Sequence, residues 1–285
     1  MSAFAVYPWA VLLGEFIVAI SIGFALNAAA AALFAGGPPD RFNNPRWSLK
    51  LALVFQAAIF PALCALSFAS WRAAAGDSAA AACLPHRDAE AGGMGLDADL
   101  SCEVATPSHS DWRSEALEWM AEAWSDASVN HSGVYDRWYL VVLLSYMTKD
   151  FCGVMPDRLL VLHHIVCATG ALVALAQPAG VRFFLVGTTA LELGSGAMNV
   201  ASLSAKHSRR GKIEKAFVLL SFVIITLSHV VAAWACIGLW RVALPAFFFV
   251  WWNVCTWPLM ALRQKTVVEE LFAVFRRYRP VVKAE

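Results

Sequence analysis

The stretch LLVLHHIVCATGALVALA, from Leu159 to Ala176, decides the fold class. It is apolar along almost its whole length, and a helix of about 20 apolar residues spans the hydrocarbon core of a bilayer. The main exceptions are two adjacent histidines, His163 and His164. An ionised residue at the centre of such a segment costs roughly 2.5–3.5 kcal/mol on insertion. The histidine pair therefore needs a polar partner, a water-filled cavity or a chemical task.

The rest of the chain repeats this apolar pattern. Of its 285 residues, 59% are hydrophobic and 15% are charged, and the mean hydropathy is +0.59. Because a soluble domain usually has about 25% charged residues, the composition predicts an all-α, polytopic membrane bundle. The first apolar run is too long and too poor in basic residues for a signal peptide. The seven predicted spans are 9–34, 49–71, 135–151, 157–177, 181–204, 215–238 and 240–262.

The charges are distributed unevenly. Residues 72–137 contain four Arg and twelve Asp or Glu, whereas the loop 206–215 contains five Lys or Arg and one Glu. The tail from Arg263 contains six Lys or Arg and three Glu. Cytoplasmic loops are enriched in Lys and Arg. With seven spans the basic segments share one side, which predicts a cytosolic C-terminus and a lumenal N-terminus and acidic segment.

The spans divide the chain into three parts. Residues 1–44 provide an N-terminal transmembrane helix and loop, and residues 45–265 the main membrane domain. Residues 266–285 form a basic amphipathic tail that suits the anionic cytosolic leaflet. An acidic lumenal insert at about 72–134 interrupts the main domain, and its composition up to residue 110 is typical of a flexible segment.

Three features of this insert concern its surroundings. Cys83 and Cys102 lie on the side predicted to be oxidising. They could form a disulfide with each other or remain as two free thiols. Asn130 begins a glycosylation sequon close to the next span, which leaves its occupancy open. Residues 111–124 have helical periodicity, with tryptophans on one face and glutamates on the other. This helix is expected either to lie on the lumenal membrane surface or to pack on the ends of the bundle.

Glu192 lies near the midpoint of the fifth span, on a polar face. Helical spacing puts small polar residues on its side and mainly apolar residues on the other. Such a stripe must face protein or a cavity. Hydrogen bonding between helices would by itself explain the threonines and serines of this stripe. It does not readily explain Glu192, because a single hydroxyl partner seldom compensates for burying a carboxyl group. The residues on the Glu192 side are Thr188, Thr189, Ser195, Gly196, Asn199 and Ser202.

The two histidines point in different directions on a regular helix. His163 shares a stripe with Cys167, which is expected to be a small packing residue, and His164 lies about 100° around the helix. Such a pair does not chelate one metal ion, so no metal is expected. We expect separate roles: one imidazole as base or nucleophile, the other as oxyanion donor or orienting partner. A structural hydrogen-bonded pair is the alternative.

Glu15, His229 and Asn253 also fall inside spans, and so do Gln56 and Asn27, which say less about function. Each of the first three could help to line a cavity around the histidines. Each is also compatible with a buried side chain that only bonds to a neighbouring helix.

Several short motifs occur in one order along the chain: Ser145-Tyr146-Met147-Thr148-Lys149-Asp150, Met155-Pro156-Asp157, His163-His164, Leu191-Glu192-Leu193-Gly194-Ser195, Asn199, Arg241 and Pro245. In these motifs and in the order of its spans, the chain resembles the TLC domain family of membrane proteins over about residues 45–265. The chain lacks the paired acidic residues and the homeobox-like insert of ceramide synthases. It looks closer to the smaller TLC-domain-containing proteins, which are linked to membrane lipid composition.

The resemblance implies a helical bundle in the endoplasmic reticulum, with a cavity in which His163, His164 and Glu192 act on a lipid. One of the histidines would activate an amine or hydroxyl, or itself carry the acyl group. Together with the polar residues above, the resemblance gives the candidate substrate-binding residues Tyr146, Asp150, Asp157, Ser195, Asn199, His229 and Asn253.

Two functions fit these expectations. The first is a lipid N- or O-acyltransferase that uses acyl-CoA as co-substrate, without a bound cofactor, to acylate a sphingoid base or a phospholipid. The second is a non-catalytic protein that binds or sorts membrane lipids. A proton-coupled transporter is a third reading, for which an inverted repeat is missing. Nothing in the sequence suggests a nucleic-acid partner, and the oligomeric state is left open.

Overall fold

The structure, a computed structural model, describes residues 9–34, 36, 45–82, 111–122, 133–151, 158–176, 179–204 and 211–278. Within these ranges every regular element is helical. The elements are α1 Trp9–Phe34, α2 Arg46–Val54, η1 Phe55–Ile59, α3 Phe60–Ala82, α4 Trp112–Ala121, α6 Gly133–Phe151, α7 Arg158–Ala176, α8 Val181–Ser204, α9 Gly211–Leu239 and α10 Ala246–Arg277.

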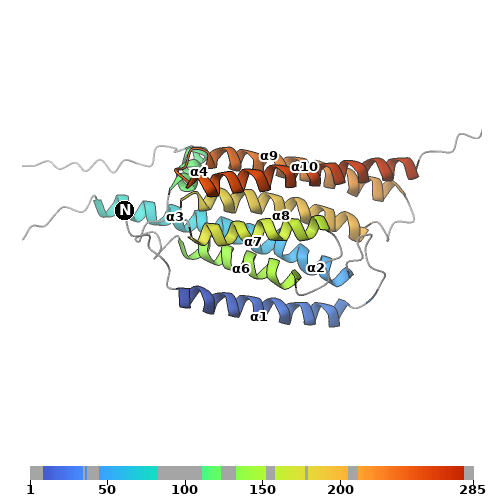
Figure 1. The fold of residues 1–285 in the computed structure, drawn as a ribbon, viewed down its shortest axis with the longest axis horizontal. Helices are drawn as coiled ribbons and strands as arrows, with labels where there is room; N and C mark the ends of the chain where they lie inside the picture. The colour runs from blue at the N-terminus through green and yellow to red at the C-terminus, as the bar shows by residue number, and fades with distance from the viewer. Residues whose placement is uncertain are drawn as a thin grey trace, which may run out of the picture.

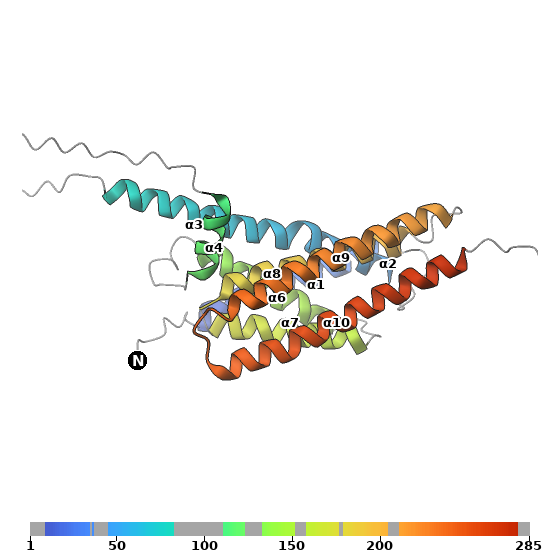
Figure 2. The same ribbon diagram turned by 90° about the horizontal axis from the view of Figure 1, so that it is seen from above.

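The long helices run roughly alongside one another, which confirms the predicted all-α bundle (Figure 1). Helix α1 lies at one edge, and α9 and α10 lie at the other. Seen from above, α3 extends beyond the end of the bundle (Figure 2). Helices α1, α6, α7, α8 and α9 lie close to five of the predicted spans. The other two differ: α2, η1 and α3 follow one another without a break to Ala82, and α10 begins at Ala246 and continues well beyond the predicted end at residue 262.

Three helices among the described residues are long and apolar enough to cross a membrane: Ala10–Phe34, Arg46–Ala75 and Ile213–Leu239. Helix α7 is apolar but shorter over Leu160–Ala176. The chain is therefore compatible with an integral membrane protein. Helix α8 carries more polar residues and is largely buried among its neighbours, so it can hold polar side chains without exposing them to lipid.

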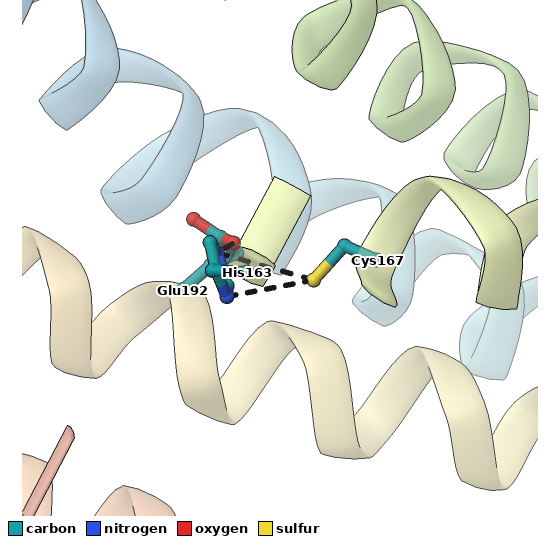
Figure 3. Close-up of side chains that lie close together, drawn as sticks. All are labelled: His163, Cys167 and Glu192. Atoms are coloured by element: carbon teal, nitrogen blue, oxygen red, sulfur yellow. Dashed lines mark hydrogen bonds and ion pairs between the residues drawn. The ribbon is translucent and has the colours of Figure 1, made fainter. Parts of the chain in front are cut away.

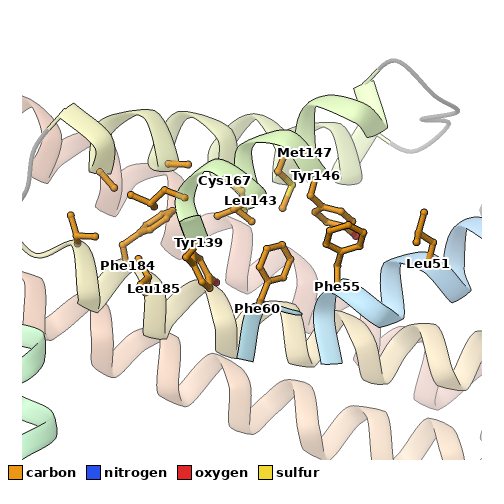
Figure 4. Close-up of a cluster of buried hydrophobic side chains, with 14 of the residues drawn as sticks. Leu51, Phe55, Phe60, Tyr139, Leu143, Tyr146, Met147, Cys167, Phe184 and Leu185 are labelled. Atoms are coloured by element: carbon orange, nitrogen blue, oxygen red, sulfur yellow. The ribbon is translucent and has the colours of Figure 1, made fainter. Parts of the chain in front are cut away.

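An aromatic cluster joins η1 and the start of α3 to α6 (Figure 4). The ring of Phe60 lies 5.4 Å from that of Tyr139 and 5.6 Å from that of Tyr146, between ring centroids. Phe55 stacks on Tyr146 at 5.0 Å. These rings are almost fully buried, and aromatic pairs at such distances stabilise a core beyond the area that they bury. The cluster fixes η1 against α6.

The π-helical turn η1 ends at Ile59, two residues before Pro61. Proline has no backbone N–H and cannot donate to the carbonyl of Ala57. The helix widens at this point, and the N–H of Phe60 bonds to the carbonyl of Phe55. Such turns add a residue to the helix and are frequent at functional sites. Here the turn contains Gln56, a buried polar residue.

A buried ion pair attaches α4 to the end of the bundle. Arg182 Nε donates to Asp136 Oδ2 at 3.0 Å, and both side chains are almost fully buried. Arg182 Nη1 donates to the carbonyl of Trp119 at 2.9 Å and to Glu122 at 3.1 Å. Trp119 and Met120 are buried. Of the two expectations for this helix, packing on the bundle end is the one that the structure shows.

The C-terminal amphipathic segment is helical, because α10 continues through it to Arg277. Val274 packs against Ala201 of α8 and Val218 of α9, whereas Phe272 and Phe275 of the same segment are exposed. One part of the apolar surface therefore contacts protein and another part is uncovered. The Tyr278 hydroxyl donates to Glu214, which raises the pKa of this phenol.

Two predictions lie outside the described residues: the pairing of Cys83 with Cys102 and the glycosylation of Asn130. Four cysteines within the described residues are free thiols: Cys64, Cys167, Cys236 and Cys255.

Candidate functional site

His163 on α7 and Glu192 on α8 face each other in the interior of the bundle (Figure 3). His163 Nε2 lies 3.2 Å from Glu192 Oε1. The two residues are 7% and 1% exposed. A buried carboxylate is costly unless it is paired and hydrogen-bonded, and the imidazole supplies one partner. The contact that the sequence suggested between these two spans is present.

Gln56 supplies the second partner of this carboxylate. Its Nε2 donates to Glu192 Oε2 at 3.0 Å, and Asn199 Nδ2 donates to Gln56 Oε1 at 2.8 Å. The chain Asn199–Gln56–Glu192–His163 thus joins η1, α8 and α7. Each bond fixes the orientation of the next side chain, and neighbouring hydrogen bonds polarise one another in a low dielectric. The Glu192 carboxylate is held in one position relative to the His163 ring.

His164 has a different set of partners. Its Nδ1 lies 2.8 Å from the carbonyl oxygen of Leu160, and its Nε2 lies 3.0 Å from Asp150 Oδ2. Each ring nitrogen of His164 therefore faces an oxygen that can accept a hydrogen bond. Lys149 also bonds to Asp150, and the Tyr146 ring stacks on His164 at 6.3 Å between centroids.

The two histidines are therefore inequivalent. Their ring centroids are 5.5 Å apart and their planes are nearly perpendicular. Both nitrogens of His164 are engaged, so this ring is not free to donate to an oxyanion, one of the roles expected for the second imidazole. The role of an orienting partner, also expected, fits its geometry. Nε2 of His163 faces Glu192, so Nδ1 is the nitrogen that can exchange a proton with a substrate, as in other histidines oriented by a carboxylate.

Cys167 is more than the packing residue that the sequence suggested. Its Sγ lies 3.7 Å from Nδ1 and 3.9 Å from Nε2 of His163, one helical turn away (Figure 3). Atoms of His163, Cys167 and Glu192 that could bind a metal ion all lie within 4.8 Å of one another. All three residues are buried. On a helix, His163 and Cys167 are four residues apart and share one face, whereas adjacent His163 and His164 do not; Glu192 joins them from α8 only through packing.

Arg263 was also missed. Its Nη2 donates to the carbonyl of Leu191 at 2.9 Å and to Ser195 Oγ at 2.7 Å, and it interacts electrostatically with Glu192. The residue is 8% exposed, and its Nη1 is buried without a hydrogen-bond partner. The seventh span was expected to end one residue earlier, which placed Arg263 in the tail. Its position instead counters the buried negative charge.

The remaining candidates divide into two groups. Tyr146, Asp150, Ser195 and Asn199 belong to the networks around His163, His164 and Glu192, as described above. His229 bonds through Nδ1 to Gln264 at 2.9 Å. Asn253 accepts from the indole N–H groups of Trp240 and Trp257. In the described part of the chain no hydrogen bond connects His229 or Asn253 to the histidine pair. Asp157, the last candidate, lies outside the described residues.

For Gln56 and Arg263 the sequence could indicate a buried interaction but could not identify the interaction partners. Both are polar residues inside or at the end of an apolar run, which by itself marks a buried interaction. Their partners lie on non-adjacent spans, and no spacing rule identifies such partners. Thr188 and Thr189 on the same stripe instead bond to Tyr139 Oη, at 2.9 and 3.0 Å.

An apolar pocket opens farther along the same stripe of α7. Its lining includes Gly170, Ala174, Phe184, Leu239 and Trp252. Its cavity volume is about 40 Å³, which is little more than the space of one or two water molecules. A lipid chain enters here only if the surrounding aromatic side chains move. The pocket is adjacent to the polar site but its lining does not include His163 or Glu192.

Comparisons with models of protein families, with curated proteins and with solved structures find no match to this chain.

Proposed function

We propose that this protein is an integral membrane acyltransferase that acts on lipids, with His163 and Glu192 as its acid–base pair. The observation that carries the proposal is the buried His163–Glu192 contact, held from the far side by Gln56 and Asn199. The contact lies in a helical bundle with apolar surfaces, so the reacting groups would meet away from bulk water. The TLC resemblance supports the same assignment.

The reaction needs a base, a leaving group and a proton donor. His163 takes a proton from the amine or hydroxyl of the acceptor lipid, which attacks the carbonyl carbon of acyl-CoA. The carbon–sulfur bond breaks, and the CoA thiolate takes the proton back from His163. Glu192 stabilises the transient imidazolium and holds the ring in place, as a carboxylate does for other catalytic histidines. The products are an acylated lipid and free CoA.

The proposal includes a location and a topology. Three helices are long and apolar enough to cross a membrane, the apolar runs of the sequence suggest seven spans, and the charge distribution favours a cytosolic C-terminus. We place the protein in the endoplasmic reticulum, with a sphingoid base or a phospholipid as acceptor, because the TLC resemblance implies both.

The test uses purified protein in lipid nanodiscs, labelled acyl-CoA and a panel of sphingoid bases and lysophospholipids. The wild type should transfer label to one acceptor class. His163→Ala and Glu192→Gln should each reduce the rate by about 10²–10⁴-fold, the usual contribution of a positioned acid or base. His229→Asn serves as the matched control, because it removes a membrane histidine outside the site. Equal transfer by His163→Ala and the wild type would end the proposal.

A second candidate function is lipid binding without turnover. The apolar pocket beside Gly170 and Trp252 favours it, because its lining is apolar and lies apart from the histidine pair. This function predicts lipid that remains bound to the purified protein at a fixed ratio. Val173 also lines this pocket. Val173→Trp should fill the pocket and release that lipid, whereas His163→Ala should retain it. Mass spectrometry of the intact protein with its bound lipid distinguishes the two.

A further inference from the structure

We infer that His163, Cys167 and Glu192 form a binding site for a zinc-type divalent cation. The three residues converge from two helices, α7 and α8, in the interior of the bundle (Figure 3). They offer an imidazole nitrogen, a sulfur and a carboxylate oxygen, all within 4.8 Å of one another. Thiolate and imidazole together select zinc over magnesium and calcium, which prefer oxygen ligands only.

The separations are close to those of a tetrahedral zinc site. Zinc bonds of about 2.0–2.3 Å place neighbouring ligand atoms roughly 3.3–3.6 Å apart. The observed separations are 3.2 Å between His163 Nε2 and Glu192 Oε1, and 3.9 Å between that nitrogen and Cys167 Sγ. Because the sulfur lies nearly equally far from both ring nitrogens, binding requires only that the ring and the thiol turn toward a common centre.

The surroundings resemble the outer shell of a metal site. Ligating carboxylates are commonly held by a further hydrogen bond, which fixes their direction. Gln56 donates to the Glu192 oxygen that does not face His163, and Asn199 holds Gln56. Three protein ligands leave one position of a tetrahedron open for water or a substrate oxygen, as in catalytic zinc sites.

The charges of a bound zinc ion, its ligands and Arg263 can also be compared. Zinc binds a thiolate, so uptake of the ion releases the proton of Cys167. The ion then meets two negative ligands, Cys167 and Glu192, and one neutral ligand, His163. Arg263 contributes the only other charge for which an interaction with this carboxylate is described. A hydroxide in the open position would bring the total, Arg263 included, to zero.

The inference concerns the same side chains as the proposed reaction but does not rest on it. Zinc takes the His163 lone pair that the proposed base uses. Zinc occupancy and acyl transfer by that route therefore exclude each other in one molecule. If the protein binds zinc and transfers no acyl group, the proposed function fails and this inference stands. If it transfers acyl groups and binds no zinc, the reverse holds.

The experiment measures metal in the full-length protein, purified in detergent and dialysed against a fixed free Zn²⁺ concentration. Elemental analysis should give about one zinc per chain for the wild type. Cobalt substitution should give a thiolate-to-cobalt charge-transfer band. Cys167→Ala should lose the band, and Glu192→Gln should weaken zinc binding at least tenfold. Gln56→Leu should weaken it about 10–100-fold, as loss of an outer-shell partner does.

Cys236→Ala is the matched control, because Cys236 is a buried thiol on α9 outside the group. It should keep both the zinc and the cobalt band. Size-exclusion profiles and melting temperatures of the variants show whether each is folded. A folded wild type without zinc, or a Cys167→Ala variant with undiminished zinc, overturns the inference.

Discussion

At the scale of single residues, the central feature is a carboxylate that is buried and fully paired. Glu192 is 1% exposed, and its two oxygens face His163 and Gln56. Removing one partner of a buried polar group costs more than the net value of the hydrogen bond, because the other group stays desolvated. The pair is therefore sensitive to changes in residues that do not themselves react.

Gln56→Leu tests this dependence. The change leaves Glu192 Oε2 and the Asn199 amide without their partner, and we expect a loss of about 1–3 kcal/mol in stability together with slower acyl transfer. Gln264→Leu is matched to it, because Gln264 also bridges two polar side chains, His229 and Thr226. It should cost similar stability and leave the rate unchanged. Thermal unfolding and the transfer assay measure both; equal rates for the two variants would contradict the account.

At the scale of helices, polar contacts and small residues set how closely the elements approach. The Arg182–Asp136 pair joins α8 to α6 and attaches α4 through the Trp119 carbonyl. Gly194 of α8 lies against Ser228 of α9, and a Cβ at Gly194 would lie 2.4 Å from the serine hydroxyl oxygen. Small residues at such crossings allow membrane helices to pack closely.

The buried ion pair gives a clear prediction. Asp136→Asn should lower the free energy of unfolding by up to about 3 kcal/mol, because the buried Arg182 then keeps only the half-exposed Glu122 as a counter-charge. The double variant Asp136→Leu/Arg182→Met should regain a large part of the loss, because neither charge then remains. Denaturant unfolding in detergent measures both. A single variant as stable as the wild type would show that the pair does not hold these helices.

The close approach of α8 and α9 at Gly194 and Ser228 gives a further prediction. Gly194→Ala should lower the melting temperature, because the added methyl group meets Ser228. Adding Ser228→Ala removes the nearer of the two serine atoms and should restore part of the loss. Gly14→Ala on α1 is the control, since a Cβ there meets nothing within 4 Å. If the second change brings no recovery, the clash is not at this crossing.

At the scale of the whole molecule, the fold follows from apolar length and the site follows from which helices become neighbours. The positions of most helices could be read from the apolar runs, although α3 and α10 continue beyond them, and the Glu192 face could be read from the 3.6-residue period. The hydrogen bond between Gln56 and Glu192 could not be predicted, because the two residues are far apart in sequence and only the packing of the helices brings them together. Arg263 was assigned to the tail because the apolar run ends before it, although α10 continues to Arg277. The position of α4 stayed open because its pattern suits either a membrane surface or a protein surface.

The topology is a prediction at this scale. A glycosylation sequon introduced at residue 95 should acquire a glycan, and a tag at the C-terminus should be accessible only from the cytosol, as the basic segments favour. Protease protection in sealed microsomes measures both. A protected C-terminal tag would contradict the predicted orientation.

The most direct test of the central claim is comparative lipidomics in cells that lack the protein. They receive the wild type, His163→Ala or Glu192→Gln at matched levels, with Gln264→Leu as a control for altered stability. The account predicts that one class of acylated lipid rises with the wild type and with Gln264→Leu but not with the two site variants. If His163→Ala and the wild type change the same lipids equally, the His163–Glu192 pair is structural, and lipid binding replaces acyl transfer as the function.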